Sequence, residues 1–65
     1  MTNNEIQSYR IGCQNSADYI SSEIGSETVE FILAKYGAAD IESISPSDLQ
    51  DVFNELYGIE ADLRN

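Results

Sequence analysis

The pattern of apolar positions is clearest between residues 44 and 58, ISPSDLQDVFNELYG. Apolar side chains recur there at helical spacing, at Leu49, Val52, Phe53, Leu56 and Tyr57. Ser45 has the side chain of an N-cap, and Pro46 fits the first helical position, where its missing N–H costs nothing. Gly58 is the residue type that closes a helix in a left-handed conformation. The pattern predicts a helix over residues 46–57.

A second helix is predicted by GSETVEFILAKYG at residues 25–37. Ser26 is placed to cap it, while Glu27 and Lys35 have the charges that its positive start and negative end favour. Its apolar stripe consists of Val29, Ile32, Leu33 and Tyr36. Gly37 ends it, so we interpret the two Tyr-Gly pairs of the chain as two helix ends rather than a duplicated site.

The N-terminal third has a long helical stripe of Ile6, Tyr9, Cys13, Ala17, Ile20 and Ile24. Thr2 and Glu5 fit a capping box at its start, and Gly25 fits its end. Gly12 and the polar run at 14–16 argue against one straight helix, because glycine inside a helix costs about 1 kcal/mol. One bent helix and two short helices both remain open. A strand is the third alternative, with Tyr9, Ile11 and Cys13 alternating, although no partner strand is evident.

These elements predict an all-α fold, a small three-helix bundle, or four helices if the first is broken near residues 12–16. Residues 1–65 then form a single helical domain. The Ile41 and Leu63 side chains, which follow the two Tyr-Gly pairs, are expected to fold inward. The predicted core consists of Ile20, Ile24, Val29, Ile32, Leu33, Tyr36, Leu49, Val52, Phe53 and Leu56.

The charge balance is strongly acidic, with 3 basic residues, 12 acidic residues and a net charge of −9. Nucleic-acid binding needs lysine and arginine to neutralise phosphates, so direct DNA or RNA binding is not expected. An anionic membrane surface would repel this chain for the same reason. The start, MTNNEIQ, lacks the basic and apolar regions of a signal peptide, and no apolar run is long enough to span a bilayer. The sequence therefore predicts a cytoplasmic protein.

The residues that usually carry catalysis are scarce, since the chain has no histidine and one cysteine. Cys13 lies on the apolar stripe, which favours a buried structural thiol over a nucleophile. A lone cysteine builds neither an intrachain disulfide nor a zinc site. Carboxylate pairs need a pocket and shifted pKa values for acid–base work. We expect no catalytic site, no metal and no cofactor.

Candidate partner-binding residues are those that the core pattern leaves over. Phe31 points away from the stripe of its helix, and Ile11 and Tyr19 lie off the first stripe. Exposed apolar side chains often mark an interface, where aromatic residues are favoured anchors. A bundle of more than two layers would bury them instead. An acidic row, whose spacing puts it on one side of the third helix, offers either a face for a basic partner or an ordinary solvated surface: Asp48, Asp51 and Glu55.

Two resemblances bear on this sequence. Residues 34–64, AKYGAADIESISPSDLQDVFNELYGIEADLR, resemble small uncharacterised accessory proteins of bacterial conjugative transposons, chiefly in Lys-Tyr-Gly-Ala and Val-Phe-x-Glu-Leu-Tyr. That resemblance implies mobile-element biology and supplies no activity. The segment FNELYGIEADL is similar to the acidic recognition helix of acyl carrier proteins. Ser47-Asp48-Leu49 departs in order from their Asp-Ser-Leu phosphopantetheine motif, so no carrier site is predicted.

The sequence thus favours a non-catalytic protein-interaction module, encoded on a bacterial mobile element and open to forming a homodimer. Its partner would be a protein, whose identity the sequence leaves open. The alternative is an acidic DNA mimic, whose carboxylates would occupy the basic groove of a DNA-binding or restriction protein.

Overall fold

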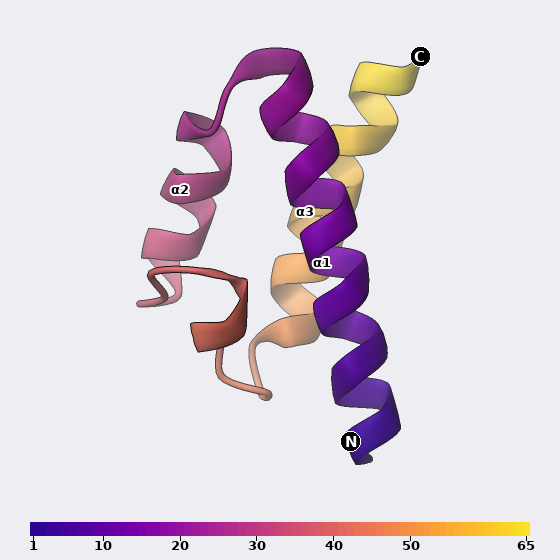
Figure 1. The fold of residues 1–65 in the computed structure, drawn as a ribbon, viewed down its shortest axis with the longest axis vertical. Coiled ribbons are helices and arrows are strands. Elements are labelled where there is room, and N and C mark those ends of the chain that lie inside the picture. The colour runs from indigo at the N-terminus through magenta and orange to yellow at the C-terminus, as the bar shows by residue number, and fades with distance from the viewer.

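The computed structural model describes residues 1–65 and contains three α-helices and one 3-10 turn. Helix α1 spans Asn3–Ile24, α2 spans Glu27–Lys35, the turn η1 spans Ile41–Ser43 and α3 spans Leu49–Arg64. Helices α1 and α3 run side by side in the same direction, and α2 runs the opposite way (Figure 1). The predicted all-α three-helix bundle is confirmed.

Helix α1 is one unbroken helix of 22 residues, so the strand and the two-helix alternatives are wrong. Its capping box is formed as predicted: the Glu5 N–H donates to Thr2 Oγ1 at 3.2 Å, and the Thr2 N–H donates to Glu5 Oε1 at 3.0 Å. Gly25, with φ of 89°, ends it. Gly12 is not a break, because its missing side chain admits the Phe53 ring of α3; a β-carbon there would lie 2.7 Å from Phe53 Cε1.

Helix α2 ends at the glycine that the sequence indicated. Gly37 has φ of 69°, and its N–H donates to the Ala34 carbonyl at 3.0 Å. The Ala38 N–H donates to the Leu33 carbonyl at 3.0 Å, which completes a Schellman motif. At the other end Ser26 holds the N-cap position without capping, because its hydroxyl bonds to Glu30 Oε2 at 3.1 Å instead.

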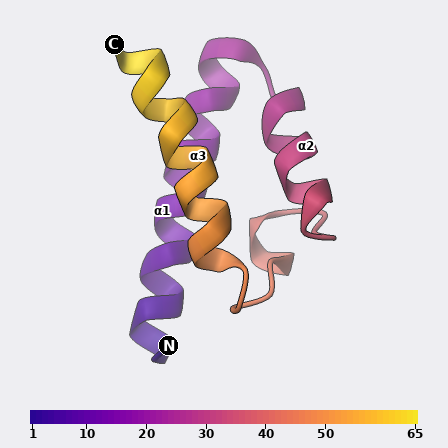
Figure 2. The same ribbon diagram turned by 180° about the vertical axis from the view of Figure 1, so that it is seen from behind.

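The segment between α2 and α3 closes the lower end of the bundle, as Figure 2 shows from behind. Asp40 accepts a hydrogen bond from the Ser43 N–H at 2.9 Å and so caps η1. Ile41 and Ile44 are buried on either side of this turn, so the inward position predicted for Ile41 is confirmed. The Ile41 carbonyl accepts a hydrogen bond from Arg10 Nη1 at 3.0 Å, which ties the turn to α1.

Helix α3 differs from its prediction at both ends. It begins at Leu49 rather than Pro46, because residues 46–48 form turns and the Ser45 hydroxyl lies 3.1 Å from Ser47 Oγ instead of capping the backbone. It continues through Gly58, which has no positive φ, to Arg64. The prediction that Gly58 ends the helix is therefore wrong: the added turns bring further side chains against α1, which offsets the roughly 1 kcal/mol cost of an internal glycine.

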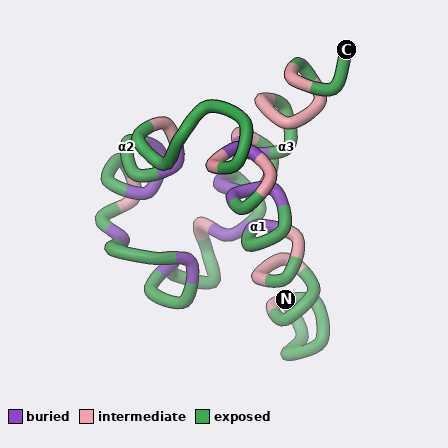
Figure 3. Tube along the Cα trace, turned by 45° about the horizontal axis from the view of Figure 1, so that its top comes forward, coloured by how far each residue is buried: buried purple, intermediate pink, exposed green.

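The core runs along the contacts between the three helices (Figure 3). Most of the predicted core is buried, and the buried apolar set is Cys13, Ala17, Ile20, Val29, Ile32, Leu33, Ala38, Ile41, Ile44, Leu49, Val52 and Leu56. Tyr36 and Phe53 are half-buried against it, as is Leu63 near the end of α3. The assignment of Ile24 to the core is wrong, because it sits in the last turn of α1 and is 51% exposed. None of the helices combines the length and apolar content needed to cross a bilayer.

Candidate interaction surface

The three basic side chains of the chain are all engaged within the molecule. Lys35 pairs with Glu55, Arg64 pairs with Glu60, and Arg10 donates to the Ile41 carbonyl. Only two of the twelve carboxylates therefore have an ion-pair partner, which leaves ten without one. The surface thus offers carboxylates in excess and has no basic side chain free of an internal contact.

The most exposed large apolar side chain is Phe31 on α2, with 68% of its surface accessible. The core stripe of α2 faces α1 and α3 through Val29, Ile32 and Leu33, and Phe31 lies on the opposite side of the helix. Lys35 follows one turn later, and its Nζ lies 5.9 Å from the centroid of the Phe31 ring. An aromatic ring of this size left in water is the residue type that anchors interfaces.

Lys35 also joins α2 to α3. Its Nζ lies 2.5 Å from Glu55 Oε1, and the neighbouring Tyr36 hydroxyl donates to Glu55 Oε2. Both oxygens of one carboxylate are therefore held by two consecutive residues of α2. We call this region the α2–α3 junction, defined by Phe31, Lys35, Tyr36, Asp48, Asp51 and Glu55.

Two groups of the α2–α3 junction, Tyr36 and Glu55, have shifted pKa values. The hydrogen bond to Glu55 is the main cause that raises the pKa of Tyr36 to about 12, followed by burial and by the negative charges of Glu55, Asp51 and Asp48. The hydrogen bonds from Lys35 and Tyr36 lower the pKa of Glu55. At neutral pH the junction thus contains a neutral tyrosine, one paired carboxylate and two acids without an ion-pair partner.

Four of the six predicted partner-binding residues belong to this junction. The Phe31 ring lies near the Lys35 ammonium group. Asp48, Asp51 and Glu55 all raise the pKa of Tyr36. Glu55 departs from its prediction as part of a free acidic face, because it ties two helices together. Lys35 and Tyr36 were assigned to dipole and core roles. The i,i+4 spacing of Phe31 and Lys35 was the available signal for Lys35.

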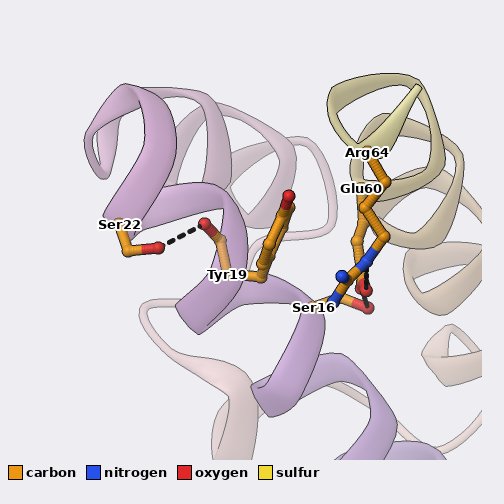
Figure 4. A network of polar contacts seen from close by, with 5 residues as sticks. All are labelled: Ser16, Tyr19, Ser22, Glu60 and Arg64. Atoms are coloured by element: carbon orange, nitrogen blue, oxygen red, sulfur yellow. Dashed lines mark hydrogen bonds and ion pairs between the residues drawn. The ribbon is translucent and has the colours of Figure 1, made fainter.

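The other two predicted residues lie elsewhere. Ile11 is 51% exposed on α1, and Tyr19 is half-buried near the C-terminal end of α3. The guanidinium carbon of Arg64 lies 4.1 Å from the centroid of the Tyr19 ring (Figure 4). Tyr19 therefore serves a contact between α1 and α3 and is not part of the surface around Phe31.

A polar network around Tyr19 joins α1 to the end of α3, as Figure 4 shows. The Ser16 hydroxyl donates to Glu60 Oε1 at 2.7 Å, and Arg64 Nε donates to Glu60 Oε2 at 2.9 Å. These two hydrogen bonds lower the pKa of Glu60, with Ser16 as the larger cause. The i,i+4 spacing of Glu60 and Arg64 was a signal for this pair, which the sequence analysis missed because it ended the helix at Gly58.

A shallow hollow of about 230 Å³ lies beside this network. Its lining comes from the last turns of α3 and the residue after them, namely Tyr57, Glu60, Ala61, Arg64 and Asn65. Glu60 and Arg64 already satisfy each other across it. The two charged groups of the hollow are therefore already used by the network.

The single thiol is part of the core. Cys13 is fully buried, and its Sγ donates to the Leu49 carbonyl at 3.9 Å. Burial raises the pKa of the Cys13 thiol, and the charge of Arg10 opposes this shift. A thiol held in its neutral form is a poor nucleophile, so its position fits the structural role predicted from the sequence.

Comparisons with protein families, with characterised proteins and with solved structures found no match for this chain.

Proposed function

We propose that this protein is a non-catalytic protein-interaction module whose α2–α3 junction docks onto a basic surface of a partner protein. The observation that carries the proposal is the 68% exposure of Phe31 on α2, in a junction whose Asp48 and Asp51 have no ion-pair partner. An apolar anchor in a junction where three carboxylates outnumber one lysine fits a partner with an apolar recess and a rim of lysine or arginine.

The charge of the whole molecule supports the same partner. With a net charge of −9 and every basic side chain engaged internally, the surface attracts basic proteins over long range and repels acidic ones. The same repulsion opposes self-association, so a basic partner is favoured over a second copy of the chain. We place this module among accessory proteins of bacterial mobile elements, following the resemblance of residues 34–64.

Affinity capture from the native host tests this function. Wild type is compared with Phe31→Ala, and Ile11→Ala serves as the matched control, because Ile11 is an exposed apolar residue outside the junction. The expected result is a basic protein retained by wild type and by Ile11→Ala, lost with Phe31→Ala, and released as salt screens the charges. Equal retention by Phe31→Ala would refute docking through the junction.

The second candidate is a DNA mimic, favoured by the ten carboxylates that lack an ion-pair partner. A mimic binds its partner through the groove that otherwise holds DNA. Duplex DNA should then displace the captured protein, whereas a partner docked through Phe31 alone should stay bound. Competition by duplex DNA that is insensitive to Phe31→Ala would favour the mimic.

A further inference from the structure

Lys35 occupies a place that is built to hold a cation. Its Nζ is 2.5 Å from Glu55 Oε1 and 5.9 Å from the Phe31 ring centroid, so it lies between a carboxylate and an aromatic face. Each of these groups attracts positive charge by itself. The Tyr36 hydroxyl holds the second oxygen of Glu55, which fixes the direction of the carboxylate toward Lys35.

Building on the proposed function, we infer that the α2–α3 junction binds an arginine of the partner protein, whose guanidinium takes the place of Lys35 on Phe31 and Glu55. Arginine suits the position better than lysine does. Its planar group stacks on aromatic faces, donates to a carboxylate oxygen from N–H groups held in a fixed plane and is more weakly hydrated than an ammonium group.

The Lys35–Glu55 pair is accessible from solvent, so an arginine of the partner can replace Lys35. The Lys35 side chain is 45% exposed and the Glu55 side chain is 33% exposed, so a partner reaches both. Exposed ion pairs contribute little to folding stability, and the lysine stem is flexible, so Lys35 moves aside at little cost. Once released, its ammonium group gains full hydration.

Two acids of the junction, Asp48 and Asp51, add attraction for a basic partner and are not neutralised by a basic side chain of the chain itself. Asp48 and Asp51 carry negative charge close enough to affect Tyr36, and neither has an ion-pair partner. They favour further basic residues near the entering arginine. Phe31 itself is 68% exposed, so its ring has a large area left for an apolar neighbour of that arginine.

A short peptide with a single arginine between apolar residues tests the inference, with its lysine analogue as the comparison. The peptide is titrated into the full chain at low salt, and the shifts of backbone and side-chain resonances are followed by NMR. We expect the arginine peptide to move the resonances of Phe31, Lys35 and Glu55. Lys35→Met removes the internal cation and keeps an apolar stem, so it should tighten binding about threefold.

Arg64→Met is the matched control, because it makes the same change in net charge at a position nine residues, or roughly 13.5 Å, along α3 from Glu55. It should leave the affinity within about 1.5-fold of wild type at a salt concentration that screens distant charges. Phe31→Ala in the Lys35→Met background should abolish the gain. Circular dichroism of each variant confirms that the helices persist.

Equal tightening by Lys35→Met and Arg64→Met would overturn the inference, as it would reveal attraction by overall charge. Equal affinity for the arginine and lysine peptides would overturn it as well. Failure of the inference is distinguishable from failure of the proposed function. If the peptide ignores Phe31 while capture of the native partner still requires it, only the arginine assignment falls; if neither requires Phe31, both fall.

Discussion

The Phe53 ring of α3 fills the space that a side chain at Gly12 of α1 would need. A β-carbon at position 12 would lie 2.7 Å from Phe53 Cε1 and 3.1 Å from Cδ1. The ring is held there by Tyr9 and Tyr57, whose ring centroids each lie 5.7 Å from that of Phe53. The glycine that weakens α1 as an isolated helix thus allows α1 and α3 to approach.

Gly12→Ala tests this contact. Alanine improves helix propensity, but the added methyl group forces the Phe53 ring to move, and overpacking of this kind costs about 1–3 kcal/mol. We expect Gly12→Ala to be less stable than Gly58→Ala by that amount in urea unfolding. The two variants make the same chemical change inside a helix, so equal stabilities would show that Phe53 does not press on Gly12.

Gly58→Ala by itself tests the continuation of α3. No atom lies within 4 Å of a β-carbon built at Gly58, and its backbone is helical. Replacing a helical glycine by alanine should therefore raise the free energy of unfolding by about 1 kcal/mol. A loss of stability would mean that position 58 adopts a left-handed conformation in solution and that the helix ends there.

Val52→Asp tests the core. Val52 is fully buried, and an unpaired carboxylate there costs several kcal/mol. A core of this size supplies only about 3–5 kcal/mol, so we expect the variant to be unfolded by circular dichroism. Ile11→Asp adds the same charge at a position that is 51% exposed and should stay helical. Cooperative melting of Val52→Asp would contradict the core assignment.

The raised pKa of Tyr36 leads us to expect a lower free energy of unfolding at alkaline pH. Its pKa in the folded protein is about 12, against an ordinary value of 10.0, so the neutral hydroxyl favours folding. This contribution is complete below pH 10 and disappears as the pH rises toward 12. Urea unfolding across that range should give a shallower decline for Tyr36→Phe than for wild type. Tyr57→Phe, which removes a hydroxyl outside the junction, should keep the wild-type slope; an unchanged slope for Tyr36→Phe would contradict the bond to Glu55.

Local patterns predicted most of the helices because short-range chemistry determines them. The capping box of Thr2, the stripe of α2 and the left-handed Gly37 depend on residues within one or two turns. The failures at Gly12 and Gly58 have a different origin. Gly12 is tolerated because it admits Phe53, and Gly58 because the residues after it contact α1. A pattern read along one segment does not contain the partner segment.

The candidate site divides in the same way. The exposure of Phe31 follows from its position opposite the α2 stripe, so the sequence indicated it. The hydrogen bonds from Lys35 and Tyr36 to Glu55 form only because the segment between α2 and α3 places the two helices side by side. The sequence of α2 does not contain this information. The contact between Tyr19 and Arg64 was missed for a related reason, since Arg64 reaches Tyr19 only when α3 continues past Gly58.

Site-specific photo-crosslinking in the native host tests the central claim most directly, because it reports contact at a chosen position. A photoreactive phenylalanine analogue replaces Phe31 in one variant and Ile11 in another. Our account predicts that position 31 crosslinks to a basic protein and that position 11 does not. Crosslinks from position 11 alone, or none from position 31 to any protein, would contradict the α2–α3 junction as the docking surface.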